Sequence, residues 1–365
     1  MSRRIRRALF HVHRWLGVGA ALYVLLIGLT GAAVVFRPEM QRAAYPAFFA
    51  PDRSASEQTA DVRAVLSELK SRYPGYNLAG IDWPTYRRDS FLAYLSSGNA
   101  FRTVFLHPVS GEVIGELPYD RIRWLQDLHI ELLGGRTGRR LNGIGAMALM
   151  LMCLSGLVLW WPGLPRWRSS LWVSRGRGWT RANRDLHGAV GFWISALLLV
   201  WSTTGVSFTA PQLFRSAVNA VLPVTVITSP TSRAATTSAT GLEAEAFIAR
   251  ARRDVPGAQL ARLVWPSTER AAVLVVMARR VHGDADTSDE VLLWFDHYTG
   301  ERLQIRDQRL RSSGDAVMAW IEPLHAGSFG GWPVKVLWSA CGLGLPLLVV
   351  SGLIMWGRTM GRLRP

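Results

Sequence analysis

Two apolar segments of this chain end in nearly the same six residues, Ser155-Gly156-Leu157-Val158-Leu159-Trp160 in one and Ser351-Gly352-Leu353-Ile354-Met355-Trp356 in the other. The first hexapeptide begins 26 residues after His129, and the second begins 26 residues after His325. Both histidines are also followed, after five and six residues, by a pair of glycines. Matches at identical offsets over such a length indicate two copies of one unit.

A second pair of histidines, His13 and His187, repeats in the same way. Each is followed after 17 residues by a threonine and a glycine, Thr30-Gly31 in the first copy and Thr204-Gly205 in the second. The sequence therefore predicts an internal two-fold repeat with two histidines in each copy.

The composition is typical of a membrane protein with substantial parts outside the bilayer. The 365 residues include 16 Trp and 34 Gly and carry a formal net charge of +16. Four apolar segments, residues 15–36, 141–161, 188–208 and 334–356, each have about the 20 residues needed to cross a hydrocarbon core. Tryptophans at their ends favour membrane spans over the apolar core helices of a soluble enzyme. We expect an α-helical integral membrane protein with four transmembrane helices.

The first of these segments follows a basic start and so has some features of a signal peptide. Its apolar run is too long, however, and His13 and Arg14 stand where the apolar region of a signal peptide begins. No convincing small-residue cleavage site follows before Arg37. We expect an uncleaved anchor.

Arginines gather at the N-terminus, in the loop after the second apolar segment and in the C-terminal tail. By the positive-inside rule these regions face the cytoplasm, so both termini are expected there. The loop is expected to meet anionic lipid headgroups, and its position between two spans argues against nucleic acid as a partner. Four basic residues on the opposite side, Arg136, Arg139, Arg140 and Lys335, are exceptions to the rule. The basic residues that set the orientation are Arg3, Arg4, Arg6, Arg7, Arg14, Arg166, Arg168, Arg175, Arg177, Arg181, Arg184, Arg358, Arg362 and Arg364.

Two longer segments, residues 39–123 and 211–321, are expected to form small α+β domains outside the membrane. Each has apolar residues at helical spacing and then strand-like runs, at residues 91–95 and 103–106 in the first and 272–277 and 291–295 in the second. A stretch rich in Ser, Thr and Ala, residues 228–240, is expected to be a linker. The other predicted parts are residues 1–38 with the first span, 124–161 with the second span and an interfacial helix at 119–132, the basic loop 162–186, the third span in 187–210, and 322–365 with the fourth span and the tail.

The four repeated histidines suggest haem. Ionisable residues at membrane depth indicate a functional site by default, and imidazole is a standard axial ligand of haem iron. His13 and His187 fall at cytoplasmic span ends, whereas His129 and His325 precede inward-running spans and lie on the outer side. Since 18 residues of helix rise about 27 Å, the sequence predicts two haems near opposite faces of the membrane. With two histidine ligands each iron has no open site, which favours electron transfer over oxygen chemistry.

Basic residues beside these histidines are candidates to pair with haem propionates. Arg139 and Lys335 stand 10 residues after the outer histidines, and Arg14 and Arg184 are close to the inner ones. The alternative for each is a cation that reaches the interface along its aliphatic stem. His11 is a rival of His13, but only His13 aligns with His187. The remaining histidines, His107, His282 and His297, are interpreted as surface residues of the outer domains.

Missing motifs exclude several other cofactors. Cys153 and Cys341 lie inside spans at positions that are not equivalent, and no C-x-x-C-H motif is present, so the haem is expected to be noncovalent and no iron–sulfur cluster is expected. No G-x-G-x-x-G nucleotide fingerprint is found, which argues against bound NAD or flavin. Electrons are then expected from another protein or from a membrane quinol.

The chain resembles the PepSY-associated transmembrane family in its order of elements and in the segments His13-Arg14-Trp15-Leu16-Gly17 and Leu186-His187-Gly188. The resemblance includes a D-x-x-T-G-E turn that begins at Asp296, and it covers nearly the whole chain. The first copy is interpreted as departing from this turn, with Leu106 where the second copy has Asp296.

This resemblance implies a bacterial inner-membrane protein linked to iron uptake, with two PepSY-like periplasmic domains. Better understood members resemble di-haem ferric-siderophore reductases of the ferrioxamine-reductase type. The implied activity is that of a haem-dependent oxidoreductase, in which two b-type haems carry electrons to a periplasmic ferric siderophore and release Fe(II). Two other hypotheses remain open: a non-catalytic PepSY protein that binds a periplasmic protein or peptide, and a di-haem cytochrome that reduces another acceptor, such as copper or an oxidised protein.

Overall fold

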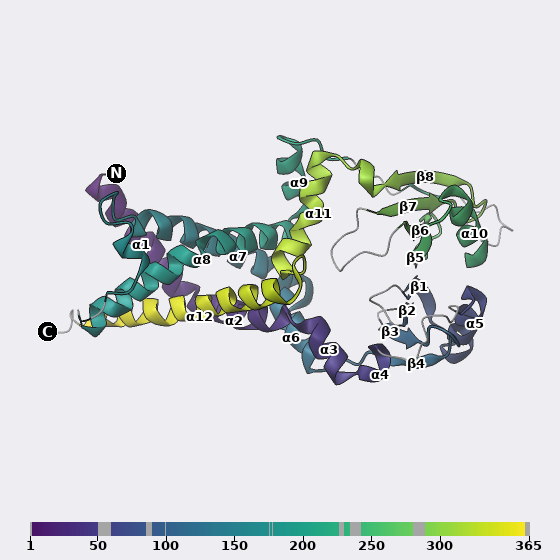
Figure 1. Cartoon of the computed structure of the whole chain (residues 1–365), viewed down its shortest axis with the longest axis horizontal. Coiled ribbons are helices and arrows are strands. Elements are labelled where there is room, and N and C mark those ends of the chain that lie inside the picture. The colour runs from purple at the N-terminus through teal and green to yellow at the C-terminus, as the bar shows by residue number, and fades with distance from the viewer. Residues whose placement is uncertain are drawn as a thin grey trace. The chain divides into compact units, whose positions relative to one another are not determined.

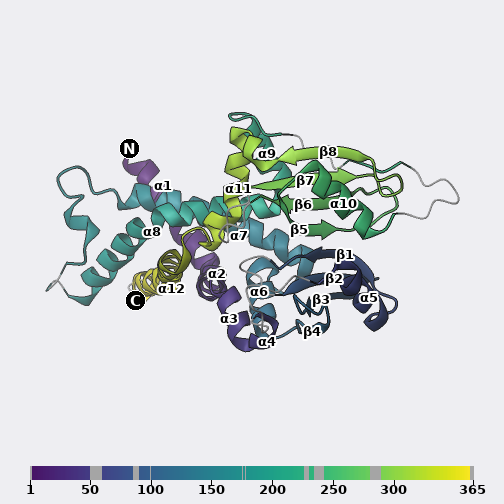
Figure 2. The same cartoon turned by 45° about the vertical axis from the view of Figure 1, so that its right-hand side comes forward.

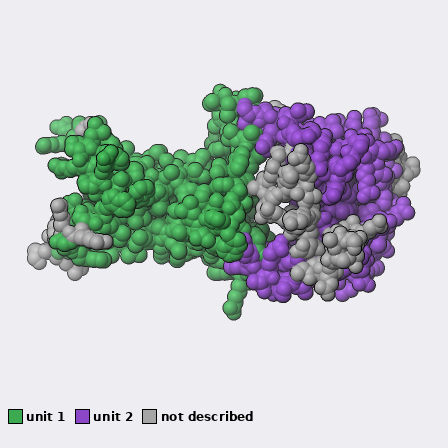
Figure 3. Space-filling model, viewed as in Figure 1, with its two compact units in different colours: residues 1–38, 120–224, 316–365 green, residues 39–119, 225–315 purple. Residues whose placement is uncertain are grey.

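The computed structural model describes residues 2–49, 60–84, 90–98, 100–174, 176, 178–225, 230–233, 242–279 and 289–361. The chain folds as two compact units, which Figure 3 colours separately. One, the helical unit, consists of Met1–Pro38, Asp120–Val224 and Ala316–Pro365, and the other, the sheet unit, consists of Glu39–Tyr119 and Thr225–Asp315. Most of the predicted linker at 228–240, and the residues Arg175, Arg177, His282, Arg362 and Arg364, lie outside the described ranges.

Three helices of the described chain are long and apolar enough to cross a membrane: α7 (Gly135–Trp160), α8 (Trp179–Thr209) and α12 (Gly331–Gly361). Helices α8 and α12 contain the predicted spans 188–208 and 334–356, and α7 covers the predicted span 141–161 except its last residue. The chain is therefore a membrane protein, with a fourth span if the bent pair α1 (Arg3–Gly19) and α2 (Ala21–Val34) is counted as one.

The first predicted span, residues 15–36, is not one straight helix. The helices α1 and α2 meet at Ala20 and are bent by 64°. Gly17 and Gly19 just before the break weaken the helix there, because glycine loses the most backbone freedom on becoming helical. The 14 residues of α2 rise only about 21 Å, so α2 alone is shorter than a hydrocarbon core of roughly 30 Å.

The long helices pack as a bundle around small and apolar residues. Helix α7 packs on α8, and α12 packs on both α2 and α8 (Figure 1). Gly28 of α2 makes close approach possible, because a Cβ atom there would lie 2.7 Å from Cβ of Leu345 on α12. Ser339 of α12 donates a hydrogen bond to the carbonyl of Ala32 at 2.9 Å. The buried core between the helices consists of Val24, Leu149, Cys153, Ile194, Leu198 and Leu345.

Shorter helices complete the helical unit. Helix α6 (Arg121–Glu131) lies within the predicted interfacial helix 119–132. Helix α11 (Ser313–Ala326) precedes α12 as α6 precedes α7. Both lie at the end of the bundle opposite the N-terminus (Figure 1). Helix α9 (Pro211–Asn219) and the 3₁₀ turn Ser169–Leu171 also belong to this unit. Helix α4 (Pro46–Phe49) and the 3₁₀ turn Gln308–Leu310 belong to the sheet unit, and α3 (Arg37–Ala44) begins in the helical unit and continues into the sheet unit.

The sheet unit contains one antiparallel sheet of eight strands in the order β4-β3-β2-β1-β5-β6-β7-β8. Two helices, α5 (Val62–Arg72) and α10 (Ala244–Asp254), cover one face of the sheet (Figure 2) and share a single apolar core with it. The strands are β1 (Asn77–Asp82), β2 (Phe91–Ser97), β3 (Ala100–Leu106), β4 (Val113–Glu116), β5 (Gln259–Val264), β6 (Val273–Ala278), β7 (Glu290–Phe295) and β8 (Arg302–Asp307).

The two segments predicted as separate α+β domains, within residues 39–123 and 211–321, thus form one sheet. Strand β1 of the first pairs with β5 of the second, with Ile81 opposite Leu263. Each of these strands is otherwise an edge with unpaired backbone groups, and pairing satisfies them. Asp82, which is fully buried, accepts hydrogen bonds from Arg262 across this junction and from the Tyr94 hydroxyl at 3.0 Å.

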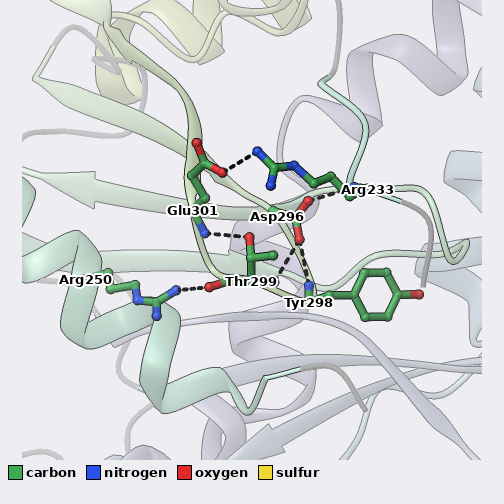
Figure 4. A network of polar contacts seen from close by, with 6 residues as sticks. All are labelled: Arg233, Arg250, Asp296, Tyr298, Thr299 and Glu301. Atoms are coloured by element: carbon green, nitrogen blue, oxygen red, sulfur yellow. Dashed lines mark hydrogen bonds and ion pairs between the residues drawn. The ribbon is translucent and has the colours of Figure 1, made fainter. Parts of the chain in front are cut away.

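The turn after β7 is built on Asp296 (Figure 4). Its carboxylate accepts hydrogen bonds from the backbone N–H groups of Tyr298 and Thr299, each at 2.9 Å, and of Arg233 at 2.7 Å. Burial opposes ionisation of this carboxyl, but the three backbone donors hold the pKa of Asp296 below its usual value. Arg250 adds a bond to the carbonyl of Thr299 at 2.9 Å.

The turn after β3 is the counterpart of this one, and the alignment of Leu106 with Asp296 is wrong by one residue. His107 occupies the equivalent position, since its N–H donates to the carbonyl of Glu112 at 2.8 Å, as that of Asp296 donates to Glu301. The His107 Nδ1 atom accepts from the N–H groups of Val109 and Ser110, each at 3.2 Å. An imidazole nitrogen therefore does in the first copy what a carboxylate does in the second.

Candidate functional site

Each of the four repeated histidines forms a hydrogen bond between its Nδ1 atom and a side-chain hydroxyl on another helix. These hydroxyls belong to the serines and threonines that follow the histidines at fixed offsets in the sequence. The four bonds are His13 to Ser155 at 2.8 Å, His187 to Ser351 at 2.9 Å, His129 to Thr30 at 3.0 Å and His325 to Thr204 at 2.7 Å.

Asn142 on α7 fixes the helix that carries His129. Its Nδ2 atom donates to the carbonyl of His129 at 2.8 Å and to that of Ile130 at 2.9 Å. The Tyr23 hydroxyl donates to Oδ1 of Asn142 at 2.8 Å and so orients the amide. The end of α6 is thereby joined to both α7 and α2.

The part of α11 that carries His325 is anchored in the same way as the end of α6. The indole N–H of Trp338 on α12 donates to the carbonyl of Leu324 at 2.8 Å, one residue before the histidine. The Phe208 ring packs edge-on against the His325 ring, with 5.2 Å between centroids. Both short helices are therefore attached, beside their histidine, to the long helix that follows them.

The rings of one predicted pair, His129 and His325, lie close together. The rings of His129 and His325 lie 6.3 Å apart between centroids and are inclined by 51°. Helices α6 and α11 are outside the candidate spans, and burial lowers the pKa of His129 to about 4. Burial, followed by repulsion from His129, lowers the pKa of His325 to about 3, so both rings are neutral at pH 7.

The two pairs are widely separated along the bundle. Helix α8 carries His187 of one pair and, 17 residues later, Thr204, which binds His325 of the other. At 1.5 Å per residue these positions are about 26 Å apart. The pairs thus lie a distance apart that is comparable to the thickness of a hydrocarbon core.

The ligand set fits haem better than a bare metal ion. Among the described residues no group of three or more His, Cys, Asp or Glu side chains is placed to hold an ion. A haem iron needs only two axial ligands, because the porphyrin supplies the other four nitrogens. Metal–imidazole bonds of about 2 Å on each side place two ring centroids roughly 6 Å apart, which the His129–His325 pair matches.

The predicted propionate partners differ from one another. Arg139 is 52% exposed and pairs with Glu131 at 3.4 Å, whereas Lys335, at the equivalent position of the repeat, is 8% exposed. Arg184 is exposed. Arg14 lies over the rings of Phe10 and Trp15.

Two buried donor atoms have no hydrogen-bond partner among the described residues. They are Nε of Arg14, which is next to His13 in the sequence, and Nε1 of Trp356, which is five residues after Ser351. A buried donor without an acceptor costs about 1–3 kcal/mol. Carboxylates of a bound group would satisfy both donors. Arg14 is one of the residues predicted to pair with a propionate, whereas Trp356 was not selected from the sequence.

The other histidines and the cysteines lie apart from these pairs. His11 is exposed and accepts from Arg14 at 3.3 Å. His107 and His297 belong to the turns of the sheet unit. Cys153 and Cys341 are free thiols, and the Sγ atom of Cys153 donates to the carbonyl of Ser195 at 3.4 Å.

The four hydroxyls are the functional residues that sequence reasoning missed as partners. Thr30, Ser155, Thr204 and Ser351 were visible only as repeated positions, because a contact across 99 to 164 residues has no local signal in the sequence. Their fixed offset from a histidine in both copies was the signal that pointed to them.

The chain belongs to the family described as the PepSY-associated TM region, which matches residues 10–358. It is also similar to an uncharacterized protein of Pseudomonas aeruginosa, with 28% identity over 250 residues. That match covers 64% of this chain and 62% of the relative's length. The family assignment agrees with the three or four apolar helices.

Proposed function

We propose that this protein carries electrons across the bacterial inner membrane, through two bis-histidine haems b, to a ferric siderophore in the periplasm. The observation that carries the proposal is the gathering of four histidines into two pairs about 26 Å apart along one bundle. Each ring has its Nδ1 atom bonded to a hydroxyl, which leaves Nε2 for a metal. Bound haem supplies a one-electron Fe(III)/Fe(II) couple at each position.

The chain's own residues hold the two positions apart and close their axial sites. His13 and His187 form the cytoplasmic pair, and His129 and His325 form the periplasmic pair, according to the positive-inside rule. If haem binds at each pair, the two imidazoles would hold its iron and leave no open position, so oxygen and the siderophore would not bind the iron directly and electrons would leave from the periplasmic pair by outer-sphere transfer. Both termini are cytoplasmic, and the sheet unit faces the periplasm.

The electron balance requires an external donor, which is a membrane quinol or a cytoplasmic reductase. One quinol gives up two electrons and two protons, and each ferric siderophore takes up one electron to become Fe(II). One quinol therefore supports two reductions.

The optical spectrum of the purified protein is the first test. Reduction with dithionite should give a sharp Soret band and split α and β bands, as bis-histidine haem b does. A protein without these bands contradicts the proposal and favours a non-catalytic PepSY protein that binds a periplasmic protein or peptide.

The acceptor is tested by mixing the reduced protein, without oxygen, with hydroxamate and catecholate ferric siderophores. Reoxidation of both haems and formation of Fe(II), trapped by a ferrous chelator, are expected. Failure with every ferric chelate contradicts iron as the acceptor, and reoxidation by a copper complex or an oxidised protein would then favour the other cytochrome hypothesis.

Orientation is tested by labelling single cysteines in whole cells with a membrane-impermeant maleimide. Cysteine replacing Ser267, in the sheet unit, is expected to react, and cysteine replacing Ser2 is expected to be protected. The reverse pattern contradicts the direction of electron flow.

A further inference from the structure

The hydroxyl groups that contact the four histidines are also bonded to the backbone of their own helices. Besides the histidine, each one bonds a backbone carbonyl three or four residues earlier in its own helix. The distances are 2.7 Å from Thr30 to Leu26, 2.7 Å from Thr204 to Val200, 2.7 Å from Ser351 to Leu347 and 3.1 Å from Ser155 to Met152.

This double bonding decides the direction of the bond to histidine. A hydroxyl has one hydrogen, and a backbone carbonyl is only an acceptor, so the hydroxyl donates to the carbonyl. Only a lone pair is then left for the ring, and Nδ1 must carry the hydrogen that it donates. The reverse assignment, in which the hydroxyl donates to Nδ1, loses the bond to the carbonyl. The favoured arrangement leaves Nε2 of every ring unprotonated.

We infer that Thr30, Ser155, Thr204 and Ser351 are positioning residues that fix the tautomer and ring orientation of the four histidines for binding iron. The inference rests on the proposed function, since it concerns the same haem positions. None of these residues touches the iron, and each acts through one histidine.

The glycine after each hydroxyl supports this arrangement at three of the four positions. A Cβ atom at Gly31, Gly156 or Gly352 would lie 2.9, 3.2 or 3.4 Å from Cε1 of His129, His13 or His187. The ring thus rests against the backbone of the helix whose hydroxyl holds it. Gly205 differs, because its nearest neighbour is Cβ of Ala146 at 3.1 Å. At these three positions the Ser/Thr-Gly pair therefore contacts the imidazole twice, through the hydroxyl and through the glycine.

Each bond also joins two helices. His13 links α1 to α7, His129 links α6 to α2, His187 links α8 to α12, and His325 links α11 to α8. The rings are therefore oriented by the bundle itself, which reduces the reorganisation needed when haem binds. Groups that bond the second nitrogen of a metal-binding histidine orient the ring and raise its basicity, and their loss typically costs about 10- to 100-fold in metal affinity.

The test compares hydroxyl-free variants in the two pairs. Thr204→Val removes the hydroxyl beside His325 with little change of shape, and Ser351→Ala removes the one beside His187. The conservative variants are Thr204→Ser and Ser351→Thr. Ser202→Ala is the matched control, because Ser202 lies two residues from Thr204, is buried, and donates only to the carbonyl of Leu199 at 3.2 Å.

Two readouts are measured on full-length protein that elutes at the wild-type volume: the rate of haem transfer to excess apomyoglobin, and the midpoint potentials from an optical redox titration. We expect Thr204→Val and Ser351→Ala each to release one of the two haems about 10- to 100-fold faster. The potential of that haem should rise, by about 59 mV for each tenfold loss of ferric over ferrous binding. Thr204→Ser and Ser351→Thr should restore both values.

The outcomes separate the inference from the proposed function. If the wild-type protein holds two haems and the hydroxyl-free variants behave like Ser202→Ala, the positioning role is wrong while the haem assignment stands. If the wild-type protein takes up no haem, both are wrong. If a variant changes both haems equally, the pairwise assignment of the hydroxyls is overturned.

Discussion

The two histidine pairs have the same bonds but different supports. His13 and His187 lie on the long helices α1 and α8 and bind serine hydroxyls. His129 and His325 lie on helices of 11 and 14 residues and bind threonine hydroxyls. The packing of the bundle places the first pair, whereas the second pair depends on anchors at the ends of two short helices. The second pair is therefore the one that single substitutions can disturb without disrupting the bundle.

The largest effect is expected from removing a ligand in either pair. His325→Ala and His187→Ala should each retain one haem of the two, because the loss of one axial bond leaves the partner ring alone. The remaining haem should differ in midpoint potential between the two variants. His11→Ala, which changes an exposed ring, should keep both haems. A protein that keeps two haems after either ligand substitution would contradict the pairing.

The next largest effect is expected from adding a Cβ atom next to one histidine ring, which should affect haem binding at only one of the two pairs. Gly31→Ala places its methyl 2.9 Å from Cε1 of His129, so the ring must shift and the haem of the second pair should be lost or loosely bound. Gly205→Ala is the control, since its methyl meets only Ala146. Overpacking costs about 1–3 kcal/mol at either site, so both variants should melt at lower temperature. Only Gly31→Ala should lose haem absorbance. Equal loss from both variants would contradict the idea that the added methyl acts by displacing the His129 ring.

The third largest effect is expected from removing the hydrogen bonds that anchor the short helices α6 and α11. Asn142→Ala removes two hydrogen bonds to the end of α6, and Trp338→Phe removes the donor to α11. Each change leaves partly buried carbonyls without their side-chain donor, at a cost of up to about 1–3 kcal/mol. We expect faster haem release from the second pair and unchanged release from the first, measured as transfer to apomyoglobin. Faster release from the His13–His187 pair would show that the supports are not local.

Acid should weaken the sheet unit and the start of α11. Asp315, in the first turn of α11, accepts from the Thr225 hydroxyl and pairs with Arg306 at 2.9 Å. Burial opposes its ionisation, but these bonds hold the pKa of Asp315 below its usual value of 3.8. In the same way, bonds from Arg309 and Arg279 outweigh burial and lower the pKa of Asp307 to about 2.

The sign of the pH effect follows from these shifts. A carboxyl with a depressed pKa stabilises the folded state fully above its unfolded pKa, and that contribution is lost as pH falls through the folded pKa. The melting temperature, followed by circular dichroism, should therefore fall between about pH 4 and pH 2. Asp307→Asn should melt lower than wild type at pH 7 and show a weaker dependence on acid. If Asp307→Asn shows the same fall of melting temperature with acid as the wild type, Asp307 is not a source of that fall.

The smallest effect is expected from the surface cation near the second pair. Arg139→Gln removes an exposed ion pair with Glu131, and such pairs contribute about 0–1 kcal/mol. Lys335→Gln changes a buried position and should slow haem uptake more, measured by titration with hemin. If Arg139→Gln has the larger effect, Arg139 contacts the haem, and its pair with Glu131 is incidental.

The sequence located the long apolar helices well because they have a local signal, and the repeated histidines stood out because their offsets are periodic. Apolar runs located α7, α8 and α12, and equal offsets singled out His13, His129, His187 and His325. The bend at Ala20 was missed because apolar composition is continuous across it.

The single sheet was missed for a different reason. Alternating apolar residues predict strands but not which edges pair, and the pairing that sets Ile81 opposite Leu263 joins segments about 180 residues apart. The edge strand β8 has few apolar residues, so it carried little signal. Likewise, the hydrogen bonds of the turn, and not the residue type, show that the imidazole of His107 has the role of the carboxylate of Asp296.

The haem content of the purified wild-type chain, measured as the pyridine haemochrome, tests the central claim most directly. Two pairs of histidines, each with a free Nε2, predict two haems b per chain. A content of zero or one, in a protein that elutes as a single folded species, would contradict the assignment of the two pairs.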